Sequence, residues 1–156
     1  ADASFDFVWS WGAIHHATDP ARALRDIHRV LRPGGELRLM VYNRHSFYNW
    51  LGIVVRYGIV RLELLRHSMQ ELWNRYSDAR AIGGCPRVGY FSAGELRRLA
   101  SGFDVLELRA FEQRAALTRF VPRSLRPALE PHIPRSVMEA LFGRFGLLLY
   151  CRARKR

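Results

Sequence analysis

The sequence predicts an α/β fold, in which a parallel sheet carries an inserted helical segment. Within the first 42 residues, a strand-like segment, an amphipathic helix and a second strand-like segment follow one another with short connections, and both strands are mostly apolar. A strand–helix–strand unit of this kind has parallel strands and a right-handed crossover. The 156 residues fit one domain, and 49% of them are hydrophobic, which is enough for a core.

The strand–helix–strand core is assigned to residues 1–42. Its first strand, Phe5–Trp11, is rich in aromatic and β-branched residues, and we expect it to be largely buried. The helix begins at Asp19 and Pro20, because aspartate caps free amides and proline suits the first turn. Pro33-Gly34-Gly35 ends the helix and turns the chain into the second strand, Glu36–Tyr42.

A helical insertion is predicted for residues 43–90. An amphipathic pattern extends from Phe47 to about Arg80, and a loop with two glycines and a proline follows at Gly83–Pro86. Long insertions that interrupt a regular α/β alternation commonly cover a binding site. We therefore expect this segment to act as a lid over a substrate.

The C-terminal helix and strand elements occupy residues 91–156. Ser92 and Glu95 form a capping box, which starts a helix that ends near Gly102. The rest of this part is predicted as a strand, a loop, a short helix and a final strand, at Phe103–Phe111, residues 118–134, Ser136–Phe145 and Leu147–Cys151.

The net charge of +11 raises the alternative of a module that binds RNA or an anionic surface. Lys155 is the single lysine, however, and the arginines are scattered except for the run Arg152–Arg156. This skew favours codon bias over a binding patch, so nucleic acid is not our expected partner. Cys85 and Cys151 lack the spacing of a zinc site or a disulfide framework, so we expect no metal and a reduced, cytoplasmic setting.

Polar side chains gather after the two predicted strands. Ligands bind at the carboxyl ends of the strands in open parallel sheets, and these two ends contain the runs Ser10–His16 and Tyr42–His45. His15 and His16 are the candidate catalytic residues, because a neutral imidazole accepts a proton near pH 7. The alternative is that they cap a helix or bind the backbone. Gly34-Gly35 precedes a strand and is therefore a turn, not a phosphate-binding loop.

The order of these motifs resembles class I S-adenosylmethionine-dependent methyltransferases of the small-molecule type, with a type 11-like domain. The resemblance covers about the first 45 residues and lies in the strand, the following His-His and Asp-Pro pairs, and a late Arg-Val-Leu-x-Pro-Gly-Gly run: Phe5–His16, Asp19-Pro20, Ala23-Leu24, Ile27 and Arg29–Gly35. It implies the C-terminal half of a Rossmann-like methyltransferase sheet, with a final antiparallel strand.

The resemblance also implies a cofactor and a reaction. S-adenosylmethionine would contact Ser10, Trp11, Gly12 and His15, and the acceptor, a small-molecule or lipid-like compound, would contact three residues of the second loop: Tyr42, Asn43 and Arg44. The family's Gly-rich loop and its ribose-binding acidic residue would precede Ala1. We therefore expect the chain to be a fragment that is inactive alone. A non-catalytic domain that keeps the fold remains an alternative.

Overall fold

The computed structural model describes every residue except 79–82, 113–121 and 123. Four strands form the main sheet in the order β1-β2-β5-β4, and a short strand β3 also pairs with β2. Strands β1 and β3 run parallel to β2, whereas β5 runs antiparallel to both β2 and β4. The predicted α/β class, with an antiparallel final strand, is confirmed. The strands span Phe5–Trp11 (β1), Leu31–Asn43 (β2), Tyr90–Phe91 (β3), Phe103–Phe111 (β4) and Leu148–Lys155 (β5).

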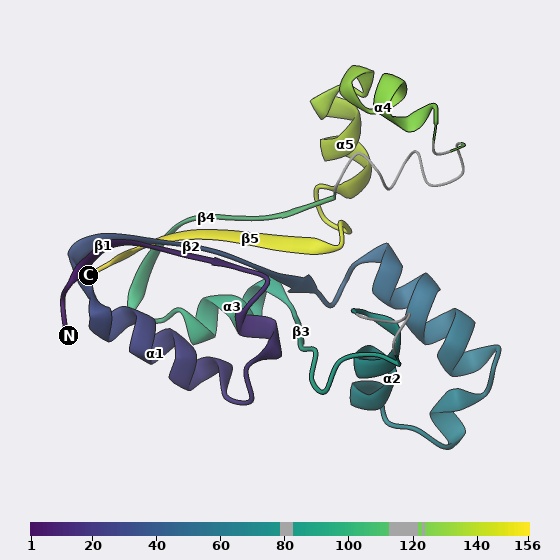
Figure 1. Cartoon of the computed structure of the whole chain (residues 1–156), viewed down its shortest axis with the longest axis horizontal. Helices are drawn as coiled ribbons and strands as arrows, with labels where there is room; N and C mark the ends of the chain where they lie inside the picture. Colours follow the sequence, from purple (N-terminus) through teal and green to yellow (C-terminus); the bar gives the residue numbers. More distant parts are fainter. Residues whose placement is uncertain (79–82, 113–121, 123) are drawn as a thin grey trace.

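Two helices pack on one side of the sheet, α1 (Pro20–Val30) and α3 (Ala93–Leu99) (Figure 1). The amide of Arg22 donates to Asp19 Oδ1 at 2.8 Å, which confirms the predicted cap of α1. The predicted capping box also starts α3. The buried core between these helices and the strands consists of Ile14, Leu24, Leu31, Leu37, Leu39, Val41, Leu96, Ala100, Phe103, Ala110, Leu149, Cys151 and Ala153; we call this set the sheet core.

The expectation that Phe5–Trp11 is largely buried is wrong. Phe5, Phe7, Trp9 and Trp11 all expose more than 40% of their surface, and Ser10 is the one buried residue of this strand. Strand β1 lies at the end of the described sheet, so it has a single neighbour, and its aromatic side chains stack on one another instead of on a helix.

Strand β2 begins earlier than predicted, at Leu31, directly after α1. The Pro33-Gly34-Gly35 turn therefore lies inside the strand, where the pairing with β1 shifts register between Phe5 and Phe7. Gly34 has a φ of 77° and, at Gly35, an added Cβ would lie 2.9 Å from the Arg32 carbonyl oxygen. Only glycine fits this bulge without strain.

The described part of the insertion, which leaves out residues 79–82, contains three helices where one helical segment was predicted. A helix of π type, η2 (Tyr48–Ile59), ends before Leu62, whose left-handed φ of 57° breaks the helical path. The short η3 (Glu63–Leu65) and α2 (Met69–Tyr76) follow. A second buried cluster lies here: Ile53, Leu72, Val88 and Tyr90; we call it the insertion core.

The predicted loop at residues 118–134 is wrong for its described second half, which forms α4 (Arg126–Leu129) and η6 (Glu130–His132). Helix α5 (Arg135–Phe142) is close to its prediction. Strand β5 extends beyond Cys151, and Arg152 Nε donates to Glu36 Oε2 at 3.1 Å. The basic run thus belongs to the sheet.

Candidate functional site

The loop after β1 brings both adjacent histidines to the carboxyl end of the sheet. Gly12 turns the chain with a φ of 73°, and its amide donates to the Met40 carbonyl oxygen of β2 at 3.3 Å. The short helix η1 (Ile14–His16) follows, and it buries Ile14 and His15 while His16 stays exposed. The centroids of the two imidazole rings lie 4.3 Å apart and the rings are tilted against each other, so both side chains belong to the same site.

An acidic side chain from the insertion completes this group. Asp78 Oδ2 lies 3.4 Å from Nε2 of His16 and 3.8 Å from Nε2 of His15. The hydroxyl of Tyr42, at the end of β2, donates to Asp78 Oδ1 at 2.5 Å. His16 Nδ1 lies 2.7 Å from the Arg87 carbonyl oxygen. We call His15, His16 and Asp78 the His-His-Asp cluster.

Burial decides the protonation of two groups here. Burial, together with neighbouring His16, lowers the pKa of His15 to about 4, although Asp78 acts in the opposite direction. The His15 imidazole is therefore neutral at pH 7. Burial and the hydrogen bond to Asp78 raise the pKa of Tyr42, which remains a hydroxyl donor. His15 Nδ1 and Asp78 Oδ2 are both buried without a hydrogen-bond partner.

An aromatic wall supports the cluster. The Tyr42 ring lies 4.5 Å from the His15 ring and 5.2 Å from the Tyr90 ring, which it stacks against. Tyr90 has a second aromatic neighbour, Trp73, whose ring lies 5.1 Å from the Tyr90 ring. These rings hold the His15 imidazole in one orientation.

The predicted cofactor residues lie beside this wall at the end of β1. Ser10 is buried, whereas Trp11 is exposed and stacks on Trp9 with ring centroids 4.9 Å apart. A Cβ added at Gly12 would lie 3.8 Å from His15 Cε1 and 3.9 Å from Met40 Cε, which is ordinary van der Waals contact, so this glycine packs directly against His15. The exposed Trp11 ring offers an apolar surface at this turn that a ligand could contact.

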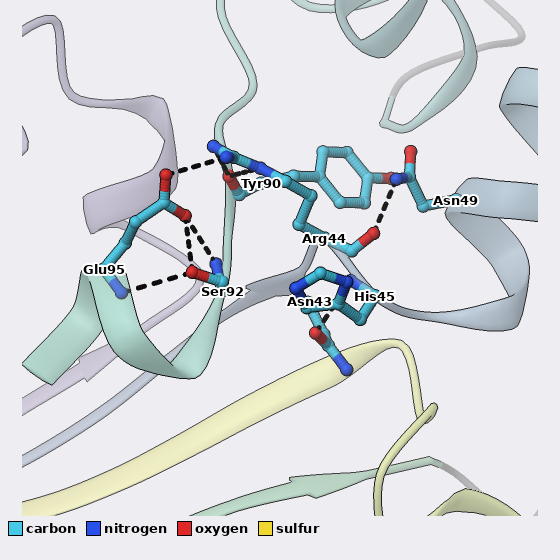
Figure 2. Close-up of polar contacts among 7 residues, drawn as sticks. All are labelled: Asn43, Arg44, His45, Asn49, Tyr90, Ser92 and Glu95. Atoms are coloured by element: carbon cyan, nitrogen blue, oxygen red, sulfur yellow. Dashed lines mark hydrogen bonds and ion pairs between the residues drawn. The ribbon is translucent and has the colours of Figure 1, made fainter.

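The remaining predicted substrate residues belong to a separate polar network (Figure 2). Arg44 Nη1 donates to Glu95 Oε1 at 2.7 Å, and its other nitrogens donate to the Tyr90 carbonyl oxygen. Asn43 donates to the carbonyl oxygens of Arg144 and Gly146 and accepts from the His45 amide. The Arg44 side chain thus holds the end of β2 to β3 and α3, whereas the Asn43 side chain holds it to the segment before β5.

A cavity of about 560 Å³ opens next to Asn43 and His45. The start of α3, strand β4 and the segment after α5 form its other walls, with Arg109 and Arg144 among the lining side chains. It is distinct in its residues from the His-His-Asp cluster.

Sequence reasoning missed Asp78 entirely. The residue stands more than 60 positions after the histidines, and no spacing motif connects it to them. The available signal was indirect: a carboxylate at the end of an amphipathic insertion is well placed to reach back to the strand ends from which that insertion departs.

The strand order and direction define the fold as that of class I methyltransferases. An S-adenosylmethionine-dependent methyltransferase from Methanosarcina mazei has this fold: the structures align with a TM-score of 0.55 at 19% identity, covering 99% of this chain and 60% of that one. A second S-adenosylmethionine-dependent methyltransferase, from Thermotoga maritima, aligns with a TM-score of 0.53 at 21% identity, covering 99% of this chain and 58% of that one.

The similarity in sequence is concentrated at the start of the chain. Residues 1–39 match the model of a family described as a methyltransferase domain. The predicted resemblance to class I S-adenosylmethionine-dependent methyltransferases is confirmed for residues 1–39 by this match, and the predicted fold is confirmed by the structural similarity. The 27-O-demethylrifamycin SV methyltransferase of Amycolatopsis mediterranei is 53% identical over 38 residues, which cover 24% of this chain and 14% of the relative.

One curated relative matches a longer part of the chain than these 39 residues. The malonyl-[acyl-carrier protein] O-methyltransferase of Dechloromonas aromatica is 33% identical over 101 residues, which cover 65% of this chain and 29% of the relative. The chain therefore matches less than a third of the length of these curated relatives. Among the residues that the structure describes, no helix is both long enough and apolar enough to cross a membrane.

Proposed function

We propose that this chain forms the acceptor-side wall of the methyl-transfer crevice in a methyltransferase that acts on a small-molecule or lipid-like compound. The observation that carries the proposal is the His-His-Asp cluster at the carboxyl end of β1, whose two histidines lie within the segment that matches the methyltransferase family. S-adenosylmethionine would supply the methyl group.

The cofactor side of the crevice is assigned to the end of β1. The exposed Trp11 ring and the Gly12 turn would contact the cofactor, with Ser10 and His15 lining the same turn. An aromatic face beside a cation contributes about 0.5–2 kcal/mol. Trp11 is therefore the residue of this turn from which we expect the largest single contribution to cofactor affinity.

His15 and His16 are the proposed catalytic residues. Methyl transfer is an in-line displacement, to which alignment of nucleophile and methyl group can contribute roughly 7–11 kcal/mol. His15 is buried and neutral, so it shapes and positions the crevice. His16 is exposed, and its Nε2 can take the proton that an acceptor hydroxyl or amine loses as its lone pair attacks the methyl carbon.

The acceptor would lie between Tyr42 and the insertion. Asn43 and Arg44 would act on it through the polar network that fixes the end of β2. The insertion is the proposed lid: its first helix exposes the apolar side chains Trp50, Leu51, Val55 and Ile59. An apolar surface of this kind fits a lipid-like or aromatic acceptor better than a sugar.

Two tryptophan variants test these assignments in the whole protein that contains this chain. We expect Trp11→Ala to weaken S-adenosylmethionine binding roughly 10-fold, within the 0.5–2 kcal/mol of an aromatic contact to a cation. Trp50→Ala is the matched control, because Trp50 is also an exposed tryptophan and lies on the insertion: the change should leave cofactor affinity unchanged and alter acceptor turnover. Equal cofactor affinities for the two variants would contradict the assignment of Trp11 to the cofactor. The absence of methyl transfer to any compound of a broad acceptor panel would contradict the proposed function.

A further inference from the structure

We propose that His15, His16 and Asp78 bind a divalent first-row transition metal ion, with Zn²⁺ as the best match. Two imidazoles and one carboxylate are ligands that zinc uses in sites that keep an open position. The spacing of the cysteines predicted no metal site, because the usual motifs place ligands close together in the chain, whereas folding brings Asp78 to the histidines from the insertion.

The distances suit such an ion. Zinc binds histidine nitrogen and carboxylate oxygen at about 2.0–2.2 Å, so neighbouring ligand atoms of a tetrahedral site lie about 3.3–3.5 Å apart. The distance from Asp78 Oδ2 to His16 Nε2 is 3.4 Å, and that to His15 Nε2 is 3.8 Å. One ligand atom from each of the three residues lies within 4.8 Å of the others. The Asp78–His16 distance already lies in this range, and an ion would draw His15 closer to the other two ligands.

The hydrogen bonds of His16 leave one nitrogen for an ion. Its Nδ1 lies 2.7 Å from the Arg87 carbonyl oxygen, which can only accept, so Nδ1 carries a proton. In the neutral ring, Nε2 then carries a lone pair, which faces the carboxylate oxygen of Asp78. Two lone pairs at 3.4 Å need a cation between them, which is either a proton or a metal ion.

The unpartnered atoms point to the metal. Asp78 Oδ2 is buried and has no hydrogen-bond partner, a state that costs about 1–3 kcal/mol or more for a charged group. A proton shared between His16 and Asp78 would leave His15 Nε2, 3.8 Å from Asp78 Oδ2, without a role. A metal ion bound to Asp78 Oδ2 would bind His15 Nε2 as well.

The surroundings of the cluster match those of known metal ligands. Ligating histidines commonly donate their second nitrogen to a backbone carbonyl, as His16 does, and ligating carboxylates are themselves hydrogen-bonded. The Tyr42 hydroxyl supplies that bond to Asp78 Oδ1 at 2.5 Å. His16 and Asp78 expose 37% and 30% of their side chains, which leaves an entry path and an open coordination position.

A metal would refine the role of His16 in the proposed methyl transfer. As a ligand, His16 would no longer accept the proton itself, and coordination to the ion would instead make an acceptor hydroxyl more acidic. This consequence rests on the proposed function, whereas metal binding does not. The test therefore measures binding alone, so a failure of one proposal is distinguishable from a failure of the other.

The probe is Co²⁺, added to the metal-free 156-residue chain and followed by its visible absorption, with Zn²⁺ then added as a competitor. We expect one Co²⁺ per chain, with the intense spectrum of a four-coordinate ion, and displacement by one equivalent of Zn²⁺. His16→Ala and Asp78→Asn should each weaken binding by more than about 100-fold. Tyr42→Phe keeps the ring and loses only the bond to Asp78, so a loss of roughly 10–100-fold is expected.

His132→Ala is the matched control, because His132 is exposed and lies outside the cluster in η6. It should bind Co²⁺ like the unaltered chain. Far-UV circular dichroism reports whether each variant is folded, and the exposed position of His16 makes its replacement the mildest change. The proposal is overturned if the folded chain takes up no stoichiometric Co²⁺, or if His16→Ala binds it as tightly as His132→Ala does.

Discussion

The sheet core and the insertion core are held together in different ways. The sheet core contains aliphatic side chains between α1, α3 and continuous strand ladders. The insertion core has only four fully buried apolar residues, and side-chain hydrogen bonds surround it. Asn49 Oδ1 accepts from Trp73 Nε1 at 2.8 Å, and Tyr48 donates to the Tyr76 carbonyl oxygen at 2.8 Å.

This difference has a consequence for the site. The histidines stand on the sheet side, whereas Asp78 belongs to the insertion. Hydrogen bonds stabilise a fold only when their geometry is maintained, whereas aliphatic burial tolerates small shifts. The His-His-Asp cluster can therefore form or separate according to the state of the insertion, and the following predictions test how independent the two regions are.

The largest expected effect is in thiol reactivity. Cys151 lies in the sheet core with 1% exposure, and Cys85 is half-buried at the edge of the insertion core. If Cys151 reacts only after global unfolding, its labelling should be slowed by roughly 10³-fold or more relative to the unfolded chain. Cys85 should react far faster. Mass spectrometry after timed alkylation separates the two sites, and equal rates would show that the regions open together.

The same thiol gives a pH dependence. Burial raises the pKa of Cys151 from 9.0 to about 11, so in this range the unfolded chain loses the proton first. Stability from this group is present below pH 9 and is lost as the pH rises towards 11. Urea unfolding at pH 8 and pH 10.5 should show this decrease, and Cys151→Ala should reduce it.

The next effect concerns the polar bonds of the insertion. Asn49→Ala leaves the Trp73 indole and the Arg44 carbonyl oxygen without partners, at about 1–3 kcal/mol for each buried group. We expect this loss to speed Cys85 labelling while Cys151 keeps its protection. The control, Leu39→Ala in the sheet core, should cost about 2–5 kcal/mol and speed both sites. Acceleration of Cys151 by Asn49→Ala would mean that the insertion does not unfold separately.

The smallest effect compares two capping boxes of the same design. Ser68 caps α2 in the insertion, and Ser92 caps α3 beside the sheet. Each serine-to-alanine change should cost about 1 kcal/mol. Amide hydrogen exchange should confine the Ser68→Ala effect to the insertion, whereas Ser92→Ala should also reduce protection in β4. Identical exchange maps for both variants would remove the distinction between the regions.

The sequence revealed the sheet better than the insertion, for a physical reason. Strand β4 and the starts of α1 and α3 depend on local signals, namely apolar alternation and caps within a few residues, and their predictions are confirmed. The break of the insertion helix at Leu62 depends on a left-handed conformation that its residue type does not favour. No periodicity reveals such a break.

Burial and the cluster required information that is not local. Trp9 and Trp11 have the composition of a buried strand, yet burial depends on which neighbours are present, and here one edge and one face of β1 are open. The histidines were recognised as site candidates because they follow a strand. Asp78 was not, because its approach depends on the path of the whole insertion.

The order of the strands in the sheet differs from the order in which the ribosome makes them. Within the described sheet, β4 pairs only with β5, which inserts between β2 and β4 (Figure 1). Residues 112–147 are synthesised after β4 and before β5. At roughly 5–20 residues per second, β4 waits about 2–7 s for its partner. During that interval the two strand edges that β5 will join, on β2 and β4, stay unpaired, and this is the stage of its biosynthesis at which a chaperone would protect the nascent chain most.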